Sequence, residues 1–223
     1  MFQLNPMAPM PTPTLKPARA QAGVTFVELA IGLAIVAIVM AVGLPMMSNW
    51  VVTNKAASAA EFYADGFAMA RREAVARNAS SRIVLTPNVS NGQMDWRVDV
   101  CYPAADVRCT NATGTWSTTT DPASNDPLGA TAGFKSVFRD AGALPQSDVL
   151  LPSIEPSGAS EIYFTALGWV DTTIDNRLTR IRLDPATRYA NEIPVAAVAV
   201  TLAGTASKCN PTLSAPDSRA CPP

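Results

Sequence analysis

The residue types that most often carry out chemistry are scarce in this chain of 223 residues, which has four cysteines and no histidine. Without histidine, it cannot form a Ser-His-Asp or Cys-His catalytic unit, a histidine-ligated zinc site or an HExxH peptidase motif. The sequence also lacks the GxGxxG, GxxxxGK[ST] and CxxC patterns. We therefore expect a protein that is not an enzyme and that uses no cofactor and no metal.

The cysteines fall into two close pairs, Cys101 with Cys109 and Cys209 with Cys221. Four cysteines allow three connectivities, and the sequence does not choose among them. Local pairing is the simplest, because short loops close at modest entropic cost. Buried free thiols are the alternative. Disulfides would place this part of the chain in an oxidising compartment.

The N-terminal region has the pattern of a membrane anchor. Residues 1–22 contain five prolines, two cations (Lys16 and Arg19) and no acid, and such a stretch cannot hold a helix. Residues 24–47 are almost entirely apolar and long enough, at about 1.5 Å per residue, to cross a hydrocarbon core of about 30 Å. Because cations stay on the cytoplasmic side, we expect the remaining chain to face outward. A buried core helix of a soluble protein is the alternative.

Residues 48–79 predict a second, amphipathic half of the same helix, which we expect to run from about residue 25 to 76. Apolar residues recur there at helical spacing and predict one buried face: Val52, Ala56, Ala59, Tyr63, Phe67, Ala70 and Ala74. Glu73 and Arg77 form a favourable i,i+4 pair, and Asn78 is expected to end the helix. Gly66 weakens a helix unless close packing requires it.

Residues 80–223 predict strands and loops. The expected strands lie in "RIVLT", "DWRVDVCY", "GFKSVFRD", "SEIYFTALGWV", "TRIRLDP" and "IPVAAVAVTLAG", with a long polar loop over residues 103–133. The fold class is therefore α+β, with one long helix on an antiparallel sheet or two small sheets. Net charge is −1, which gives no general attraction to nucleic acid.

Two stretches resemble a known family. "GVTFVEL", residues 23–29, resembles the type III signal of type IV prepilins and pseudopilins. "AMARREAVARNASSRIVL", residues 68–85, resembles the signature of the GspH/FimT group. The resemblance implies a pilin-like fold and cleavage between Gly23 and Val24 by a membrane-embedded prepilin peptidase, followed by N-methylation of Val24. Val24 departs from the phenylalanine usual there. Pro45 stands where the family often has a helix-kinking proline.

The resemblance also implies an organisation and a set of partners. Residues 1–23 would be the leader peptide, 24–47 the transmembrane half of the helix, 48–79 its amphipathic half, and 80–223 a periplasmic β-rich domain with a cysteine-closed C-terminal tail. The chain would cross the bacterial inner membrane once, with its N-terminus in the cytoplasm, and would reach the cell surface if incorporated into a pilus. Other pilins or pseudopilins and an inner-membrane assembly platform would be its partners, in a type IV pilus or a type II secretion filament, where it would be a minor subunit at the tip or in priming.

Glu28 is an acid at the front of an apolar segment, and a charge at mid-membrane costs about 3 kcal/mol. Cleavage would free the amine of Val24, four residues earlier and on the same helix face. We hypothesise that Glu28 pairs with this amine, in its own subunit or in a neighbour, because losing either partner strands the other charge. A carboxylate that reaches to the membrane interface is the alternative.

A second functional hypothesis is DNA binding for transformation. Some FimT-like proteins bind DNA through a Gly-Arg-x-Arg motif after the last strand. Here Gly204 is kept, but Thr205 and Ser207 replace the arginines, and only Lys208 and Arg219 remain as cations near the Cys209–Cys221 pair. Phosphate binding needs several cations together, so we do not expect a nucleic-acid partner.

Overall fold

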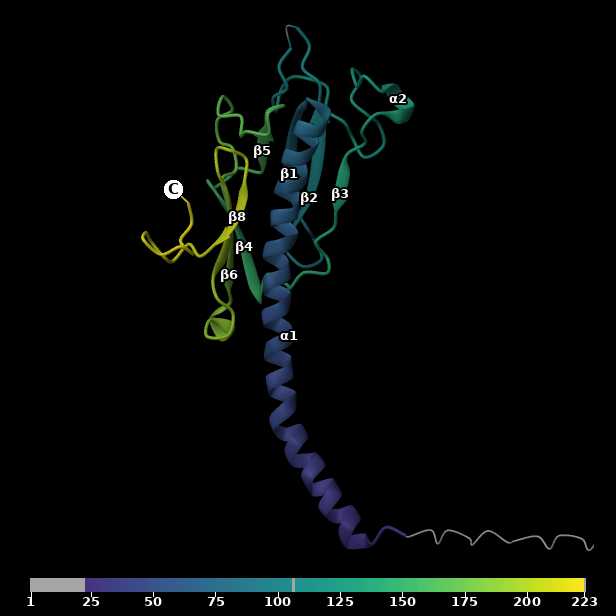
Figure 1. Cartoon of the computed structure of the whole chain (residues 1–223), viewed down its shortest axis with the longest axis vertical. Helices are drawn as coiled ribbons and strands as arrows, with labels where there is room; N and C mark the ends of the chain where they lie inside the picture. Colours follow the sequence, from purple (N-terminus) through teal and green to yellow (C-terminus); the bar gives the residue numbers. More distant parts are fainter. Residues whose placement is uncertain (1–22, 106, 223) are drawn as a thin grey trace, which may run out of the picture. The chain divides into compact units, whose positions relative to one another are not determined.

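The computed structural model describes residues 23–105 and 107–222, apart from the side chains at positions 42, 44–46, 48 and 49. The chain divides into two compact units, residues up to 45 and residues 46–223. The second unit, the outer domain, combines the second half of a long helix with two antiparallel sheets (Figure 1). The predicted α+β class is confirmed.

The long helix, α1, spans Phe26–Arg77, close to the predicted bounds. It ends as the sequence predicts, because Asn78 adopts a left-handed backbone with φ of 48°. The amide of Ala79 then donates to the carbonyl of Ala74 at 3.1 Å, and the amide of Asn78 donates to the carbonyl of Val75 at 3.3 Å. These are the two bonds of a Schellman motif, which satisfies carbonyls that the last turn leaves free.

The first sheet has the strand order β3-β2-β1-β5. Its strands are β1 (Ser80–Pro87), β2 (Met94–Cys101), β3 (Val137–Arg139) and β5 (Glu161–Phe164). β1 and β2 pair along their full length, from Ser80 opposite Cys101 to Pro87 opposite Met94. The loop that leads to β3 contains one short helix, α2 (Gly129–Ala132), within the stretch predicted to be irregular.

The second sheet has the order β4-β6-β7-β8. Its strands are β4 (Leu150–Glu155), β6 (Arg180–Pro185), β7 (Ala196–Val200) and β8 (Ala206–Cys209), with a 3-10 turn, η1 (Thr187–Tyr189), after β6. β4 and β8 lie outside the strands expected from the sequence. "SEIYFTALGWV" was expected to form one strand, but β5 ends at Phe164, and a tight turn follows in which the amide of Gly168 donates to the carbonyl of Thr165 at 2.8 Å.

One main hydrophobic core joins the second half of α1 to both sheets. The predicted helix face is confirmed, because Ala56, Ala59, Tyr63, Phe67, Ala70 and Ala74 are buried and Val52 packs at the edge. The buried side chain of Gln93 connects the layers: its carbonyl oxygen accepts from the Tyr63 hydroxyl at 3.1 Å, and its amide donates to the Leu150 carbonyl at 2.6 Å. Burial raises the pKa of Tyr63 well above its usual range.

Gly66 is explained by close packing. A Cβ at this position would lie 2.7 Å from Cδ1 of Ile83 and 3.1 Å from the Trp96 ring. The Trp96 ring is held in place, because its Nε1 donates to the Phe62 carbonyl of α1 at 3.0 Å. The glycine therefore lets α1 approach the first sheet closely, and this packing offsets its low helix propensity of about 1 kcal/mol.

Candidate functional site

The predicted cleavage position lies in an irregular, exposed segment directly before α1. Gly23 and Val24 precede the helix start at Phe26, and both are exposed. Among the described residues, a Cβ at Gly23 would contact nothing within 4 Å. Cleavage between Gly23 and Val24 stays a prediction.

Thr25 caps the start of α1, which the sequence analysis missed. Its Oγ1 accepts from the amide of Glu28 at 3.2 Å, and its carbonyl accepts from the amide of Leu29 at 3.1 Å. The pattern Thr-x-x-Glu is the capping-box signal, which could have been found in the sequence. Glu28 is thus at the third helical position, where a carboxylate also interacts favourably with the helix dipole. The pairing of Glu28 with the Val24 amine stays a prediction.

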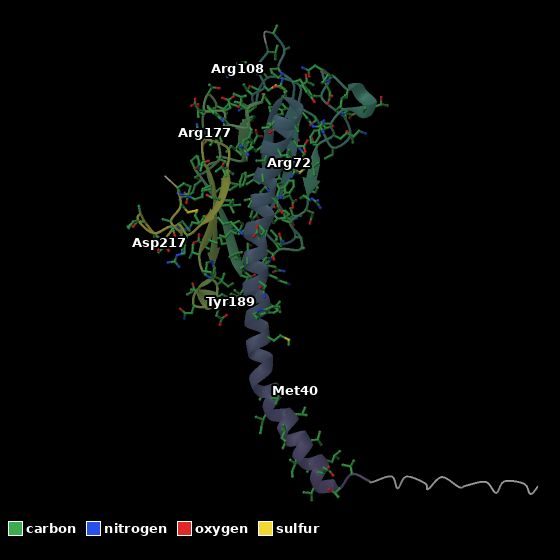
Figure 2. All side chains as sticks on the ribbon, viewed as in Figure 1. Met40, Arg72, Arg108, Arg177, Tyr189 and Asp217 are labelled. Carbon is green, nitrogen blue, oxygen red and sulfur yellow. A yellow bond between two sulfur atoms is a disulfide. The ribbon has the colours of Figure 1, made fainter. Side chains whose placement is uncertain are left out.

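The first half of α1 exposes its large apolar side chains. From Phe26 to Met40 these side chains are between 49% and 84% exposed, and they lie around Met40 and below it in Figure 2. Within the described residues, no helix combines the length and mean hydropathy expected of a membrane span. The predicted span, residues 24–47, stays a prediction. The Pro45 side chain lies outside the described residues, and so does the kink expected there.

Arg71, in the stretch that resembles the GspH/FimT signature, joins α1 to two turns. Its Nε donates to the Gly168 carbonyl at 3.2 Å. A Cβ at Gly204 would lie 3.1 Å from Cδ of Arg71 and would overlap with the Gly168 carbonyl oxygen. Both glycines have a positive φ, 77° and 76°. Arg71 and the close approach of the two glycines therefore hold the turn after β5 and the β7–β8 turn against the helix.

The predicted ion pair between Glu73 and Arg77 is confirmed. The Nε of Arg77 lies 2.9 Å from Oε2 of Glu73. The guanidinium of Arg77 also lies over the ring of Phe134, 4.4 Å from its centroid, which is a cation–π contact. The end of α1 is thereby held to the segment that precedes β3.

Both local disulfides are formed, Cys101–Cys109 and Cys209–Cys221. The second bond ties the C-terminal tail across the outer face of β7 and β8, where Cys221 packs on Ala197 and Ala199. The tail continues through parallel pairing of Asn210 with Ala220. The predicted cysteine-closed tail is therefore present in the outer domain.

The two candidate DNA contacts each have an acidic partner. Lys208 forms an ion pair with Glu61 of α1, and Arg219 lies 2.9 Å from Asp217. The Arg219 guanidinium, donating to Asp217, lowers the pKa of that carboxyl to about 2. Asp217 lies in the tail (Figure 2). Since the nearest acid already neutralises each cation, the pair offers little free positive charge to a phosphate backbone.

The outer face of the first sheet carries a charged cluster that sequence reasoning did not identify. The buried carboxylate of Asp99 accepts from the Nε atoms of Arg82 at 2.9 Å and of Arg97 at 2.7 Å. Arg82 also lies 3.5 Å from Glu161, which accepts from the Tyr163 hydroxyl. Burial and the Glu161 hydrogen bond raise the pKa of Tyr163 to about 12. Pairing across three strands creates the cluster, so no sequence motif indicates it.

Among the described residues, no three cysteine, aspartate or glutamate side chains come together as a metal site would require. Comparison with family models matches residues 59–204 to the family described as type II transport protein GspH. This range is well over half of the chain and runs from the second half of α1 to the β7–β8 turn. Neither the curated proteins nor the solved structures gave a match.

Proposed function

The chain belongs to the GspH family, and from that premise we propose that it is a structural pseudopilin or minor pilin, without enzymatic activity. A prepilin peptidase would cleave Gly23–Val24 and methylate Val24. Residues 24–47 would anchor the subunit in the inner membrane, with the outer domain in the periplasm. The subunit would then enter a filament as a minor component at or near its tip, in contact with other pseudopilins and the assembly platform.

The observation that carries this proposal is the row of exposed apolar side chains from Phe26 to Met40, directly after an accessible Gly23. Each buried CH2 contributes about 0.8 kcal/mol, so such a helix gains strongly when lipid or neighbouring helices cover it. A segment that is covered by lipid before assembly and by other helices afterwards suits a filament subunit. The family's description, type II transport, supports a secretion filament over a pilus.

The contribution of Glu28 can be separated from the capping of the helix. Glu28→Gln removes the charge but keeps a residue that suits a capping box, whereas Thr25→Ala removes the cap at a cost of about 1 kcal/mol and keeps the charge. We expect both variants to be cleaved and methylated, as mass spectrometry of the N-terminus would report. Only Glu28→Gln should lose incorporation, as measured in sheared filaments by immunoblot.

Asp65→Ala is the matched control, because Asp65 is an exposed acid on the second half of α1 without an ion pair among the described residues. It should incorporate normally. If Thr25→Ala lost incorporation and Glu28→Gln kept it, Glu28 would serve only the helix start, and the proposed pairing with the Val24 amine would be wrong. Failure of all variants to be cleaved, wild type included, would overturn the assignment as a processed pseudopilin.

A further inference from the structure

A polar cavity of about 210 Å³ lies in the outer domain where three loops meet β5. The loops are those around residues 109–114, 156–160 and 171–178. Polar side chains from all three loops and from β5 line the cavity: Asn111, Ser160, Glu161, Tyr163, Asp175 and Asn176. No function discussed above uses this cavity.

Four of these side chains have unused hydrogen-bonding capacity. In the part of the chain that the structure describes, the side chains of Asn111, Ser160, Asp175 and Asn176 form no hydrogen bond and no ion pair. Several other loop asparagines of this domain are engaged through their side chains, among them Asn88, Asn91, Asn125 and Asn210. Exposed side chains with free donors and acceptors thus gather around one concave site.

A disulfide and a hydrogen bond between loops hold the walls of the cavity. The Cys101–Cys109 disulfide closes the loop that leads to Asn111. Arg108, next to that disulfide, donates from Nη2 to Oγ1 of Thr173 at 2.9 Å and so ties this loop to the 171–178 loop. Figure 2 shows Arg108 and Arg177 toward the same end of the outer domain. A preformed site loses less entropy on binding than one that must order its loops.

The floor of the cavity is equally well held. The amide of Leu178 donates to the carbonyl of Glu161 at 2.7 Å, which fixes the 171–178 loop to β5. The Tyr163 ring, only 3% exposed, packs edge-on against Trp116 at 5.7 Å between centroids and so supports the floor from below. Ile174 adds one aliphatic side chain to an otherwise polar lining.

The residue types select among ligand classes. Amides and a hydroxyl provide donors and acceptors together, and hydroxyl groups use both. Of the described residues, two carboxylates but no lysine or arginine line the cavity, which disfavours phosphates and carboxylates as ligands. The volume lies below the roughly 300–1,000 Å³ of pockets for drug-sized ligands, so a single small ring fits. We propose that this cavity binds one neutral, hexose-sized sugar unit, free or at the end of a glycan.

The test uses the full chain in a detergent without a sugar headgroup. Saturation-transfer NMR would be recorded with methyl glycosides of glucose, galactose, mannose and N-acetylglucosamine, followed by titration of any that bind. Asn111→Ala and Asn176→Gly remove one amide each, and glycine keeps the positive φ of 51° at position 176. Asn54→Ala is the matched control, an asparagine on the exposed face of α1. A glycan array would then separate a free sugar from a glycan end.

We expect at least one glycoside to bind, with about fivefold weaker affinity in each cavity variant and unchanged affinity in Asn54→Ala, as the loss of one hydrogen bond predicts. Absence of binding to every glycoside, or binding that the cavity variants leave unchanged, would overturn the proposal. Calcium or an alkylammonium ion binding in place of sugars would assign the cavity to cations and would also overturn it. Filament incorporation should not change in these variants, so the result is independent of the proposed assembly role.

Discussion

Replacing Gly204 with alanine tests whether the contact between the β5 turn and the β7–β8 turn stabilises the outer domain. Two costs are expected at this position. An L-residue at a φ of 76° costs about 1–2 kcal/mol. The new Cβ would also overlap with the carbonyl oxygen of Gly168, which is main chain and cannot rotate away as a side-chain end could.

The second cost is estimated from overpacking, which typically amounts to about 1–3 kcal/mol. Relief of the overlap would move the Gly168 carbonyl, and with it the 3.2 Å hydrogen bond from Arg71. The two costs together should lower the free energy of unfolding of Gly204→Ala by about 2–5 kcal/mol. For a protein of this size, that corresponds to a fall in Tm of roughly 5–15 °C.

Gly129→Ala is the matched control, because Gly129 has a φ of 73° and a Cβ there would meet no described residue within 4 Å. Gly129→Ala should lower the free energy of unfolding only by the cost of placing an L-residue at a positive φ, about 1–2 kcal/mol. Thermal and guanidinium unfolding of both variants, followed by circular dichroism without reductant, would measure the difference. If Gly204→Ala and Gly129→Ala lowered Tm by the same amount, the turn-to-turn contact would contribute nothing and the reasoning would be refuted.

Three further predictions concern the core and two titrating groups. Phe67→Ala should lower the free energy of unfolding by about 3–5 kcal/mol, since Phe67 is fully buried, and denaturant unfolding would show it. Absorbance at 295 nm should show Tyr163 ionising near pH 12, and this signal should be absent in Tyr163→Phe. Because folding raises the pKa of Tyr163, the stability that the neutral side chain contributes is present below pH 10 and is lost from about pH 10 to 12. NMR should place the pKa of the Asp217 carboxyl near 2, and Arg219→Gln should return this pKa toward its usual value. Because folding lowers this pKa, the stability that the ionised carboxylate contributes is lost as pH falls from about 4 to 2.

The helix was predictable because its signals are local. The buried residues from Ala56 to Ala74 follow a 3.6-residue period, and Asn78 is a residue type that readily adopts the left-handed cap. The start of α1 was predicted within a residue, although the Thr25 cap was overlooked. Local patterns of this kind can be read from the sequence because they do not depend on contacts with distant parts of the chain.

The two strands that were missed lack such signals. β4 contains Pro152, which cannot donate to a ladder and argues against a strand unless it lies at a sheet edge, as it does here. β8, "ASKC", is short and has no β-branched or aromatic residue. The order of the strands in the two sheets likewise depends on long-range pairing that periodicity does not encode.

The candidate site was predictable only in part. Gly23, Val24, Glu28 and the local cysteine pairs could be proposed from motif and spacing. The contact of Arg71 with Gly168 could not, because its partner lies 97 positions further along the chain. The same holds for the cavity, whose side chains come from three loops and β5, between residues 111 and 176.

The order in which the chain is synthesised gives the core a further consequence. α1 leaves the ribosome first, yet its buried residues Tyr63 and Phe67 share a core with Val198 of β7, about 130 residues later. At roughly 5–20 residues per second, some 7–25 s pass before Val198, the last fully buried residue of this core, is made. Until then the core is incomplete, so the unfinished chain keeps part of its apolar surface uncovered.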